Sequence, residues 1–236
     1  MTRPWLSVIV PAYHEEERIA ALLAHVAALP APGGVEVIVA DGDPERSTLT
    51  AIPHGLPLAV VPLAAPKGRA RQMNAGAAEA RGDILLFLHA DTRLPQEAFV
   101  LIQAALADQG ICGGAFSLAI EPEGKTAGPG LRFIAWAANL RARFTRAPYG
   151  DQAIFIRRGI LEAIGGYADV PLMEDLELMT RLRRRGLRIA LLGSCVATSG
   201  RRWEREGLLR CTGRNLLLRA LYHLGVPPGR LAEYYK

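Results

Sequence analysis

Acidic side chains follow three apolar segments of this sequence, close to the point where each segment ends. The acids are Glu15, Asp41 and Asp91, and they follow the segments at residues 6–10, 35–40 and 84–88. An isolated carboxylate beside a buried strand is costly, so it needs a partner or a metal ion. One or two carboxylates, completed by phosphate oxygens, typically bind a small divalent cation. The pattern predicts metal-assisted chemistry on a phosphorylated ligand, with Asp91 as the metal ligand, although Glu15 alone is better explained as a helix cap.

The phosphates of such a ligand would not be held by a glycine-rich loop. No G-x-G-x-x-G follows the first apolar segment, and no G-x-x-x-x-G-K-[ST] occurs, which excludes the two common phosphate-binding loops. A short basic segment contains Lys67, Arg69 and Arg71 and leads into a predicted helix, whose N-terminus favours anions. We therefore expect the cation and these side chains to hold the phosphates.

Hydrophobic periodicity predicts an α/β sheet that brings the acids together. Strands are expected at 6–10, 35–40, 58–62, 84–88, 115–120, 153–156 and 188–192, and helices at 18–28, 72–80, 96–107, 131–144, 176–184 and 208–224. Alternating strands and helices are typical of a parallel sheet covered on both faces, and ligands bind beyond the carboxyl ends of its strands. We expect one domain at 1–205, a mobile loop at 121–129, and a C-terminal helical extension at 206–236.

The composition is that of an ordinary globular protein. The chain has 236 residues, enough for one domain with a full core, and 50% of them are hydrophobic. It shows no signal-peptide pattern and no apolar run of the roughly 20 residues that span a bilayer, so we expect a cytoplasmic protein. The three cysteines, Cys112, Cys195 and Cys211, form no C-x-x-C pair and are expected to be buried free thiols.

Five segments, in order, resemble the motifs of family 2 glycosyltransferases. They are SVIVPAYHEE at 7–16, VADGD at 39–43, KGRARQMNAG at 67–76, LHADT at 88–92 and MED at 173–175. The likeness extends over about residues 5–205 and is strongest to a small bacterial subgroup with H-A-D-T in place of D-x-D and a late Arg-Arg-Trp. It implies a GT-A-like fold, in which a mostly parallel, mixed sheet flanked by helices forms a single nucleotide-diphospho-sugar transferase domain.

The resemblance implies an inverting transfer of a sugar from a nucleoside-diphosphate sugar, assisted by a divalent metal ion. Such a displacement needs a base for the acceptor hydroxyl and positive charge near the departing diphosphate. Asp175, with Glu174 beside it, matches the family's catalytic acidic pair, and helix capping is the alternative role for both. Asp91 matches the metal ligand. His89 stands where the family has its first Asp, which favours Mn²⁺ over Mg²⁺ and leaves the affinity for the metal open.

The resemblance also assigns binding residues, and a structural role is the alternative for each of them. Those on the donor side are Pro11, Ala12, Tyr13, Glu15, Asp41, Lys67, Arg69, Asn74, His89 and Ala90. Those expected near the acceptor or the diphosphate are Asp151, Gln152, Arg201, Arg202 and Trp203. Asp41 could accept the N3–H of uracil, which favours a UDP-linked donor, although guanine also offers N–H donors.

The predicted C-terminal helix interleaves leucines with arginines. We expect it to pack on its own domain or on a partner subunit, as in a homodimer, rather than on a membrane. A peripheral contact with the inner face of a membrane, and with it a lipid-linked acceptor, stays open. The formal net charge of +5 fits an anionic ligand or surface, or reflects only an arginine-rich composition.

Other functions are weaker interpretations of the same residues. A non-catalytic or degenerate sugar-nucleotide-binding protein is supported by His89 and opposed by the presence of Asp91 and Asp175. A sugar-phosphate nucleotidylyltransferase would need a glycine-rich loop after the first strand, and residues 11–17 contain no glycine. Nucleic acid is not an expected partner, because the basic residues are not interleaved with aromatic ones in a recognisable motif.

Overall fold

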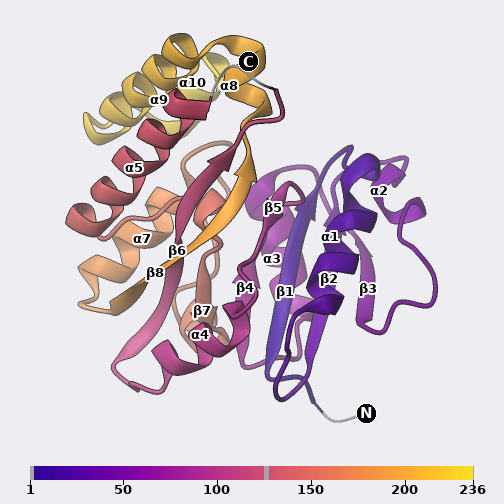
Figure 1. Cartoon of the computed structure of the whole chain (residues 1–236). Coiled ribbons are helices and arrows are strands. Elements are labelled where there is room, and N and C mark those ends of the chain that lie inside the picture. Colours follow the sequence, from indigo (N-terminus) through magenta and orange to yellow (C-terminus); the bar gives the residue numbers. More distant parts are fainter. Residues whose placement is uncertain (1–2, 125–127, 236) are drawn as a thin grey trace.

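A computed structural model describes residues 3–124 and 128–235, whose strands form one eight-stranded sheet (Figure 1). The strands are β1 (Leu6–Ala12), β2 (Val35–Asp41), β3 (Ala59–Ala64), β4 (Ile84–Phe87), β5 (Thr92–Arg93), β6 (Ile111–Glu121), β7 (Phe155–Arg157) and β8 (Arg188–Ser199). Their order across the sheet is β3-β2-β1-β4-β7-β6-β8-β5. The predicted α/β class and mixed sheet are confirmed.

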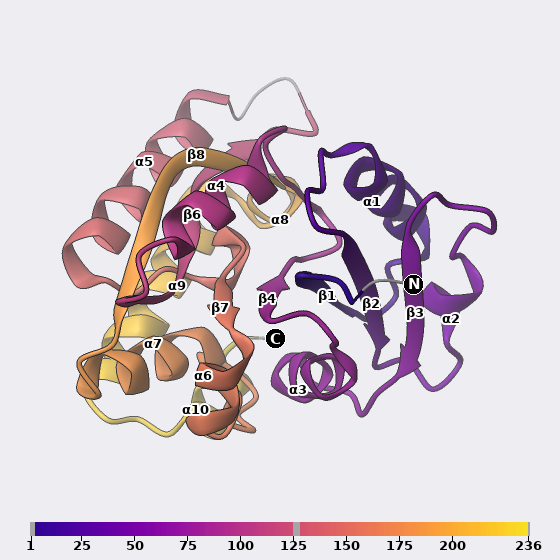
Figure 2. The ribbon, with the colours of Figure 1, turned by 90° about the horizontal axis from the view of Figure 1, so that it is seen from below.

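Helices cover both faces of this sheet. They are α1 (Glu16–Ala28), α2 (Ser47–Thr50), α3 (Arg69–Glu79), α4 (Ala98–Leu106), α5 (Gly128–Thr145), the 3₁₀ turn η1 (Gly150–Gln152), α6 (Arg158–Ala163), α7 (Glu174–Arg184), α8 (Arg201–Glu206), α9 (Leu208–His223) and α10 (Pro228–Glu233). Viewed along the strands, α1 lies on one side of β1 and β2 and α3 on the other (Figure 2). Two hydrophobic cores result, one on each face.

The first half of the sheet is parallel. β1 pairs with β2 and β4, and β2 pairs with β3, all in the same direction. The strand β1 is buried on both faces: Val8 and Val10 join the core under α1, and Ile9 joins the core under α3. Burial on both faces explains why β1 and β2 are mostly apolar rather than alternating; their buried polar residues, Ser7 and Glu36, bond each other at 2.7 Å.

The second half of the sheet mixes directions. β7 runs antiparallel to β4 and β6, and β8 pairs in parallel with β6 as far as Ser199. The predicted end of the last strand at 192 is therefore too early, because β6 supplies a pairing partner beyond the polar segment that begins at Gly193. The two-residue strand β5 has no sequence signal and forms by pairing with the end of β8.

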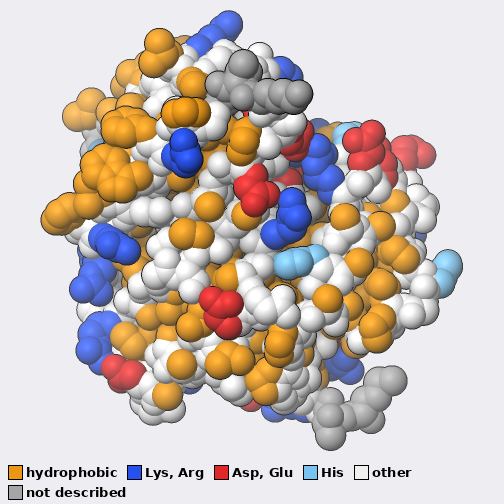
Figure 3. Space-filling model, viewed as in Figure 1, with side chains coloured by type: hydrophobic (Ala, Val, Ile, Leu, Met, Phe, Trp, Pro, Cys, Tyr) orange, Lys and Arg blue, Asp and Glu red, His pale blue; other side chains and the backbone are white. Residues whose placement is uncertain are grey.

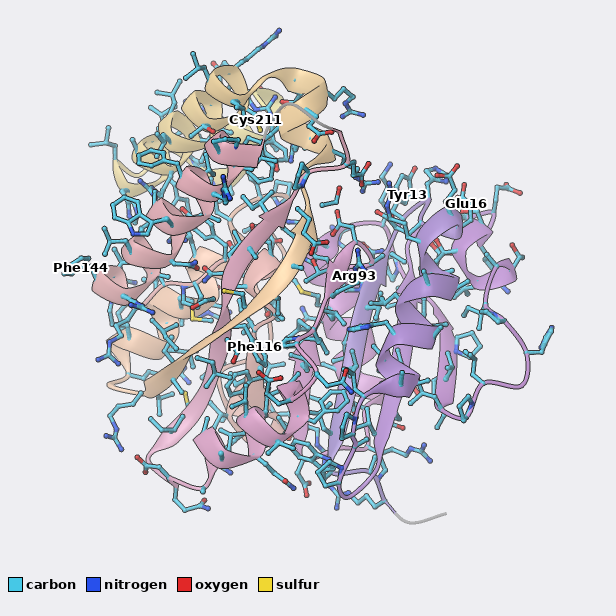
Figure 4. The ribbon with its side chains drawn as sticks, in the orientation of Figure 1. Tyr13, Glu16, Arg93, Phe116, Phe144 and Cys211 are labelled. Carbon is cyan, nitrogen blue, oxygen red and sulfur yellow. The ribbon has the colours of Figure 1, made fainter. Side chains whose placement is uncertain are left out.

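The C-terminal helices pack on the rest of the chain. Leu218 of α9 and Leu231 of α10 are buried in a small cluster with Leu172, which precedes α7. Cys211 lies inside these helices (Figure 4), and Cys112 is also buried. The prediction of a buried thiol is wrong for Cys195, which is exposed on β8.

Two further expectations meet the limits of the described residues. The predicted loop at 121–129 includes residues 125–127, which lie outside them, while Glu121 ends β6 and Gly128 begins α5. Within the described ranges, every helix is too short or too polar to cross a bilayer.

Candidate functional site

A cavity of about 610 Å³ opens at the carboxyl ends of β1 and β4. It is the place where the sequence predicted the ligand. The sheet contributes Pro11, Glu15 and the segment after β4; the turns before η1 and α7 contribute further polar side chains; and α5, α8 and α9 close the other side. The cavity thus has acidic side chains on the sheet side and a mixture of apolar side chains and arginines on the later helices.

Asp91 and Glu15 face the same guanidinium in this cavity. Arg201, at the start of α8, lies 3.6 Å from a carboxylate oxygen of Asp91 and 3.3 Å from one of Glu15. The hydroxyl of Thr198 on β8 is 3.5 Å from the other oxygen of Asp91. The structure therefore brings together one predicted metal ligand, one donor-side acid and one diphosphate-side arginine, from three separate parts of the chain.

His89 and Asp175 converge on Gly150. A methyl group added at Gly150 would lie 3.2 Å from Nε2 of His89 and 3.8 Å from Oδ2 of Asp175. Burial, and then the positive charge of Arg69, lower the pKa of His89 to about 4. The imidazole is therefore neutral near pH 7, which is the form that binds a metal ion or accepts a hydrogen bond.

Asp175 is held rigidly at the wall of the cavity. Its Oδ2 accepts a 2.8 Å hydrogen bond from the backbone N–H of Gly150, and its Oδ1 accepts one of 2.7 Å from Leu176. Burial, and then the negative charge of Glu174, raise the pKa of Asp175 to about 6. The N-cap of α7 is Met173, with no side-chain cap, so the capping role considered for Asp175 is not the one seen. A fixed carboxylate with a raised pKa suits proton transfer.

Glu174 forms the buried half of an ion pair with Arg69. Its side chain is only 4% exposed, and its Oε1 accepts a 3.1 Å hydrogen bond from the guanidinium of Arg69, whose side chain as a whole is 48% exposed. The pair joins the start of α3 to the start of α7 across 105 residues. It places a positive charge beside Asp175 and His89.

We expect Arg69→Met to lower the free energy of unfolding by about 2 kcal/mol, measured as the shift in urea midpoint. The loss follows because Glu174 would be left as an unpaired buried charge. Breaking a fully buried ion pair typically costs more, about 3–5 kcal/mol. The loss expected here is smaller because half of the Arg69 side chain is exposed to water. The double variant Arg69→Met/Glu174→Gln should recover most of the loss, since an amide carries no charge. Equal instability of the single and double variants would contradict this account.

Asp151 is a second acid in the cavity, and one of its oxygens has no hydrogen-bond partner although it is buried. Burial, and then the negative charge of Asp175, raise the pKa of Asp151 to about 6. Arg141 lies nearby, with its guanidinium 3.5 Å from the centre of the Tyr149 ring, and burial lowers the pKa of Arg141. An unsatisfied carboxylate in a cavity is destabilising and therefore points to a ligand contact.

Asp151→Asn should stabilise the protein at neutral pH by about 1–3 kcal/mol. Folding raises the pKa of this carboxyl from 3.8 to about 6. The free energy of unfolding therefore falls as the pH rises from about 4 to about 6, because the carboxyl must ionise inside the folded chain. Asparagine removes the buried charge, and the gain should disappear near pH 4, where the carboxyl is already neutral. Urea melts at both pH values measure this, and a gain that persists unchanged at low pH would refute the electrostatic cause.

Several predicted donor-side residues are instead engaged in holding the fold. The carboxylate of Asp41, 1% exposed, accepts hydrogen bonds from the backbone N–H groups of Asp43, Thr48 and Leu49 at 3.0, 3.1 and 3.3 Å. It fixes the loop after β2, which differs from the predicted contact with a nucleoside base. Asn74 exchanges two 2.8 Å hydrogen bonds with the backbone of Tyr167 and ties α3 to that segment.

Other predicted residues are divided between the cavity and its surroundings. Gln152 is 2% exposed and bonds the backbone of Phe116 and Tyr149, so it shapes the η1 turn from behind. The ring of Tyr13, at the upper end of β1 in Figure 4, lies under Lys67 at 4.1 Å and its hydroxyl accepts a 2.9 Å hydrogen bond from it. The predicted residues that line the cavity are Pro11, Glu15, Arg69, His89, Ala90, Asp91, Asp151, Glu174, Asp175, Arg201, Arg202 and Trp203.

Two cavity arginines were not predicted. Arg141 comes from α5, and Arg219 comes from α9, where its guanidinium donates a 3.3 Å hydrogen bond to the Tyr149 hydroxyl. In the sequence, each is an arginine within a helix that is otherwise rich in apolar residues. That position was the signal that could have pointed to a site. Their charges give the part of the cavity beside α5 and α9 a positive lining.

The residues present fit a divalent ion only together with its ligand. Among residues 3–124 and 128–235, no three His, Cys, Asp or Glu side chains are arranged as a complete metal site. The chain offers the partly exposed carboxylate of Asp91 and the neutral imidazole of His89. An ion that takes one carboxylate and completes its shell with water and phosphate oxygens matches this donor set.

Comparison with known proteins agrees with the arrangement. The sequence model of glycosyl transferase family 2 matches residues 7–165, and no match is found among curated protein sequences. A mannosyltransferase, PcManGT from Pyrobaculum calidifontis in complex with GDP-Man and Mn²⁺, has a similar structure, with a TM-score of 0.61, 23% identity, and coverage of 83% of this chain and 56% of that one.

A second similar structure is that of S. aureus TarS 1-349 in complex with UDP-GlcNAc. Its TM-score is 0.58 at 18% identity, and the alignment covers 82% of this chain and 58% of that one. The chain spans less than two thirds of the length of either protein. At these identities the likeness establishes the fold, which is that of GT-A glycosyltransferases.

Proposed function

This chain belongs to glycosyl transferase family 2, and on that premise we propose that it moves a sugar from a nucleoside-diphosphate sugar to an acceptor hydroxyl with inversion at the anomeric carbon. The observation that carries the proposal is the position of Asp175. Its carboxylate is fixed by two backbone N–H groups, has a raised pKa, and shares one cavity with Asp91 and Arg201.

Asp175 is the proposed general base. It takes the proton of the acceptor hydroxyl as the hydroxyl oxygen bonds to the anomeric carbon, and the bond from that carbon to the diphosphate oxygen breaks on the opposite side. A single displacement of this kind inverts the configuration. The hydrogen bonds from Gly150 and Leu176 hold the carboxylate in one orientation, so no rotation is needed at the moment of transfer.

The leaving diphosphate gains negative charge, and the cavity supplies positive charge to match it. Arg69 and Arg201 line the sheet side, and Arg202 follows on α8. Asp91, with His89 beside it, would hold a divalent ion, Mn²⁺ or Mg²⁺, which when bound screens the diphosphate as a Lewis acid. Arg201 lies between Asp91 and Glu15 in the structure, and a bound diphosphate would offer it a stronger anionic partner.

The nucleoside base of the donor is open between uracil and guanine. The two similar structures hold GDP-mannose and UDP-GlcNAc, and Asp41, on which the preference for UDP rested, spends its carboxylate on the backbone. Tyr13, Lys67 and Glu15 lie at the end of β1 and beside it, where they could meet a base or a ribose; in the structure Lys67 bonds Tyr13, and Glu15 pairs with Arg201. A cytoplasmic location and a homodimer stay predictions from sequence.

Calorimetric titration with UDP, GDP, dTDP and CDP, each with and without Mn²⁺, tests the donor site. We expect one nucleotide to bind best and its affinity to rise with Mn²⁺. If none of the four binds under either condition, the donor-site assignment is wrong. If one binds but its sugar conjugate is never cleaved, the non-catalytic alternative is favoured.

A further inference from the structure

Helices α5 and α9 together expose a group of large apolar side chains that no other described residue covers. The exposed large hydrophobic residues on them are Phe133, Trp136, Leu140 and Phe144 of α5, and Leu209, Leu216 and Leu217 of α9. We call this surface the α5–α9 face. In Figure 3 hydrophobic side chains gather over these helices at the upper left, and in Figure 4 Phe144 projects outward from α5.

This concentration is unlike the rest of the described surface. Phe144 is 81% exposed and Leu209 is 91% exposed, whereas the exposed large hydrophobics outside the two helices, such as Val100 on α4, are scattered. On α5 the spacing is 133, 136, 140 and 144, which forms one stripe along an α-helix. Scattered exposed apolar residues need no explanation, but a contiguous patch marks an interaction surface.

The charge of the two helices is of one sign. Arg132, Arg141 and Arg143 lie in α5, and Arg210, Arg214 and Arg219 lie in α9, while neither helix contains an Asp or a Glu. Arg132, Arg143 and Arg210 are exposed beside the apolar stripe. Arginines flanking aromatic residues on a helix suit a bilayer surface with anionic headgroups, in which the rings enter the interface and the guanidinium groups meet phosphates.

The same charge disfavours a second copy of the chain as the occupant. A two-fold symmetric contact would place this face against itself and bring its arginines together without any acidic partner on either helix. An anionic surface would reduce the repulsion among these arginines, whereas a second copy of the same face would increase it. Charge complementarity therefore selects a lipid surface.

The face is also continuous with the cavity. Phe133 of α5 and Leu216 of α9 both belong to the α5–α9 face and both line the cavity that contains Asp175. Arg141 and Arg219 line the cavity just behind them. A molecule whose apolar part lies in the bilayer could therefore reach the cavity along the apolar wall, with its polar head passing the arginines.

We propose that the α5–α9 face docks on an anionic lipid bilayer and that the acceptor is an amphiphile presented from that bilayer. The residues of the α5–α9 face support the docking by themselves, whereas the nature of the acceptor also rests on the proposed function. Phe133, Trp136 and Phe144 enter the interface, and Arg132, Arg143 and Arg210 contact the lipid phosphates.

Vesicle flotation with the full chain tests the docking without nucleotide or activity. Vesicles of phosphatidylcholine alone and of equimolar phosphatidylcholine and phosphatidylglycerol are compared at low and high salt. We expect binding only to the anionic vesicles, weakened by salt. Trp136→Ser/Phe144→Ser should weaken it by at least about tenfold, and Arg132→Glu/Arg143→Glu/Arg210→Glu by at least about a hundredfold.

Matched controls use similar residues on other parts of the surface. Two variants should bind vesicles like the unaltered chain: Val100→Ser on α4, and Arg46→Glu, which directly precedes α2 at the right of Figure 1, away from α5 and α9. Absence of binding to anionic vesicles, or equal binding by all variants, would overturn the proposal. Concentration-dependent dimers that disappear in Trp136→Ser/Phe144→Ser would assign the face to a second copy instead. Nucleotide titration of the same samples without vesicles shows separately whether the donor site is intact.

Discussion

Asp175→Asn is expected to lower the rate of sugar transfer by about a thousandfold while leaving nucleotide affinity within about twofold. Asparagine has the size of aspartate but cannot take a proton at neutral pH. The carboxylate is held by the backbone N–H groups of Gly150 and Leu176, and the proposed metal ligand is Asp91, so loss of the Asp175 charge should spare the donor site. Release of nucleoside diphosphate from the donor, with water or a sugar as acceptor, gives the rate, and calorimetry gives the affinity.

The pH profile separates a base from a structural acid. The pKa of Asp175 is raised to about 6, and a base acts in its deprotonated form. The value of kcat/KM should therefore rise with pH through about 6 and level off above it. In Asp175→Asn the residual rate should lack this rise.

Asp151 provides the internal comparison, because the pKa of its carboxyl is raised to a similar value in the same cavity. If the acidic limb and the rate survive in Asp175→Asn but are lost in Asp151→Asn, the base has been assigned to the wrong carboxylate. If both variants keep the full rate, neither carboxylate is the base. Unfolding midpoints of both variants must be measured alongside, since each changes the burial of charge in the cavity.

The strands under the site could be predicted because their apolar residues follow one another in the sequence and so indicate burial. β1, β2 and β4 are mostly apolar segments that pack on both faces, and Asp91 follows the last of them at the edge of the sheet where ligands are expected to bind. Glu15 and Asp91 could be placed near each other from that pattern alone. The role of Asp175 needed the family resemblance, since an acid at the start of a helix is usually a cap.

The remaining parts of the site depend on contacts between distant segments, which no local pattern encodes. Arg69 meets Glu174 across 105 residues, and Arg201 meets Glu15 across 186. Arg141 and Arg219 enter the cavity only because α5 and α9 pack beside each other over it. The surroundings of Asp41 could not be predicted either: its loop folds back and supplies three backbone donors, and the contact with a nucleoside base stays a prediction.

Asp91→Asn is expected to abolish the contribution of Mn²⁺ to nucleotide affinity, a loss of about a hundredfold or more when Mn²⁺ is present and little change when it is absent. Asp91 is the carboxylate that follows β4, and among the described residues its oxygens make long contacts with the Thr92 and Thr198 hydroxyls, at 3.4 and 3.5 Å, and with the Arg201 guanidinium, at 3.6 Å. These weak contacts leave it available to an ion. Calorimetry with the best-binding nucleotide, with and without Mn²⁺, measures both affinities.

Glu15→Gln is the matched control, because Glu15 contacts the same guanidinium but does not follow β4. It should retain the rise in affinity with Mn²⁺. His89→Ala should retain part of it, since a neutral imidazole can contribute one ligand but no charge. If Asp91→Asn still responds fully to Mn²⁺, the ion is held elsewhere or by the nucleotide alone. If the unaltered chain does not respond to Mn²⁺ at all, Arg201, already seated between Asp91 and Glu15, does the work of the cation, and Arg201→Ala should then be the variant that loses the nucleotide.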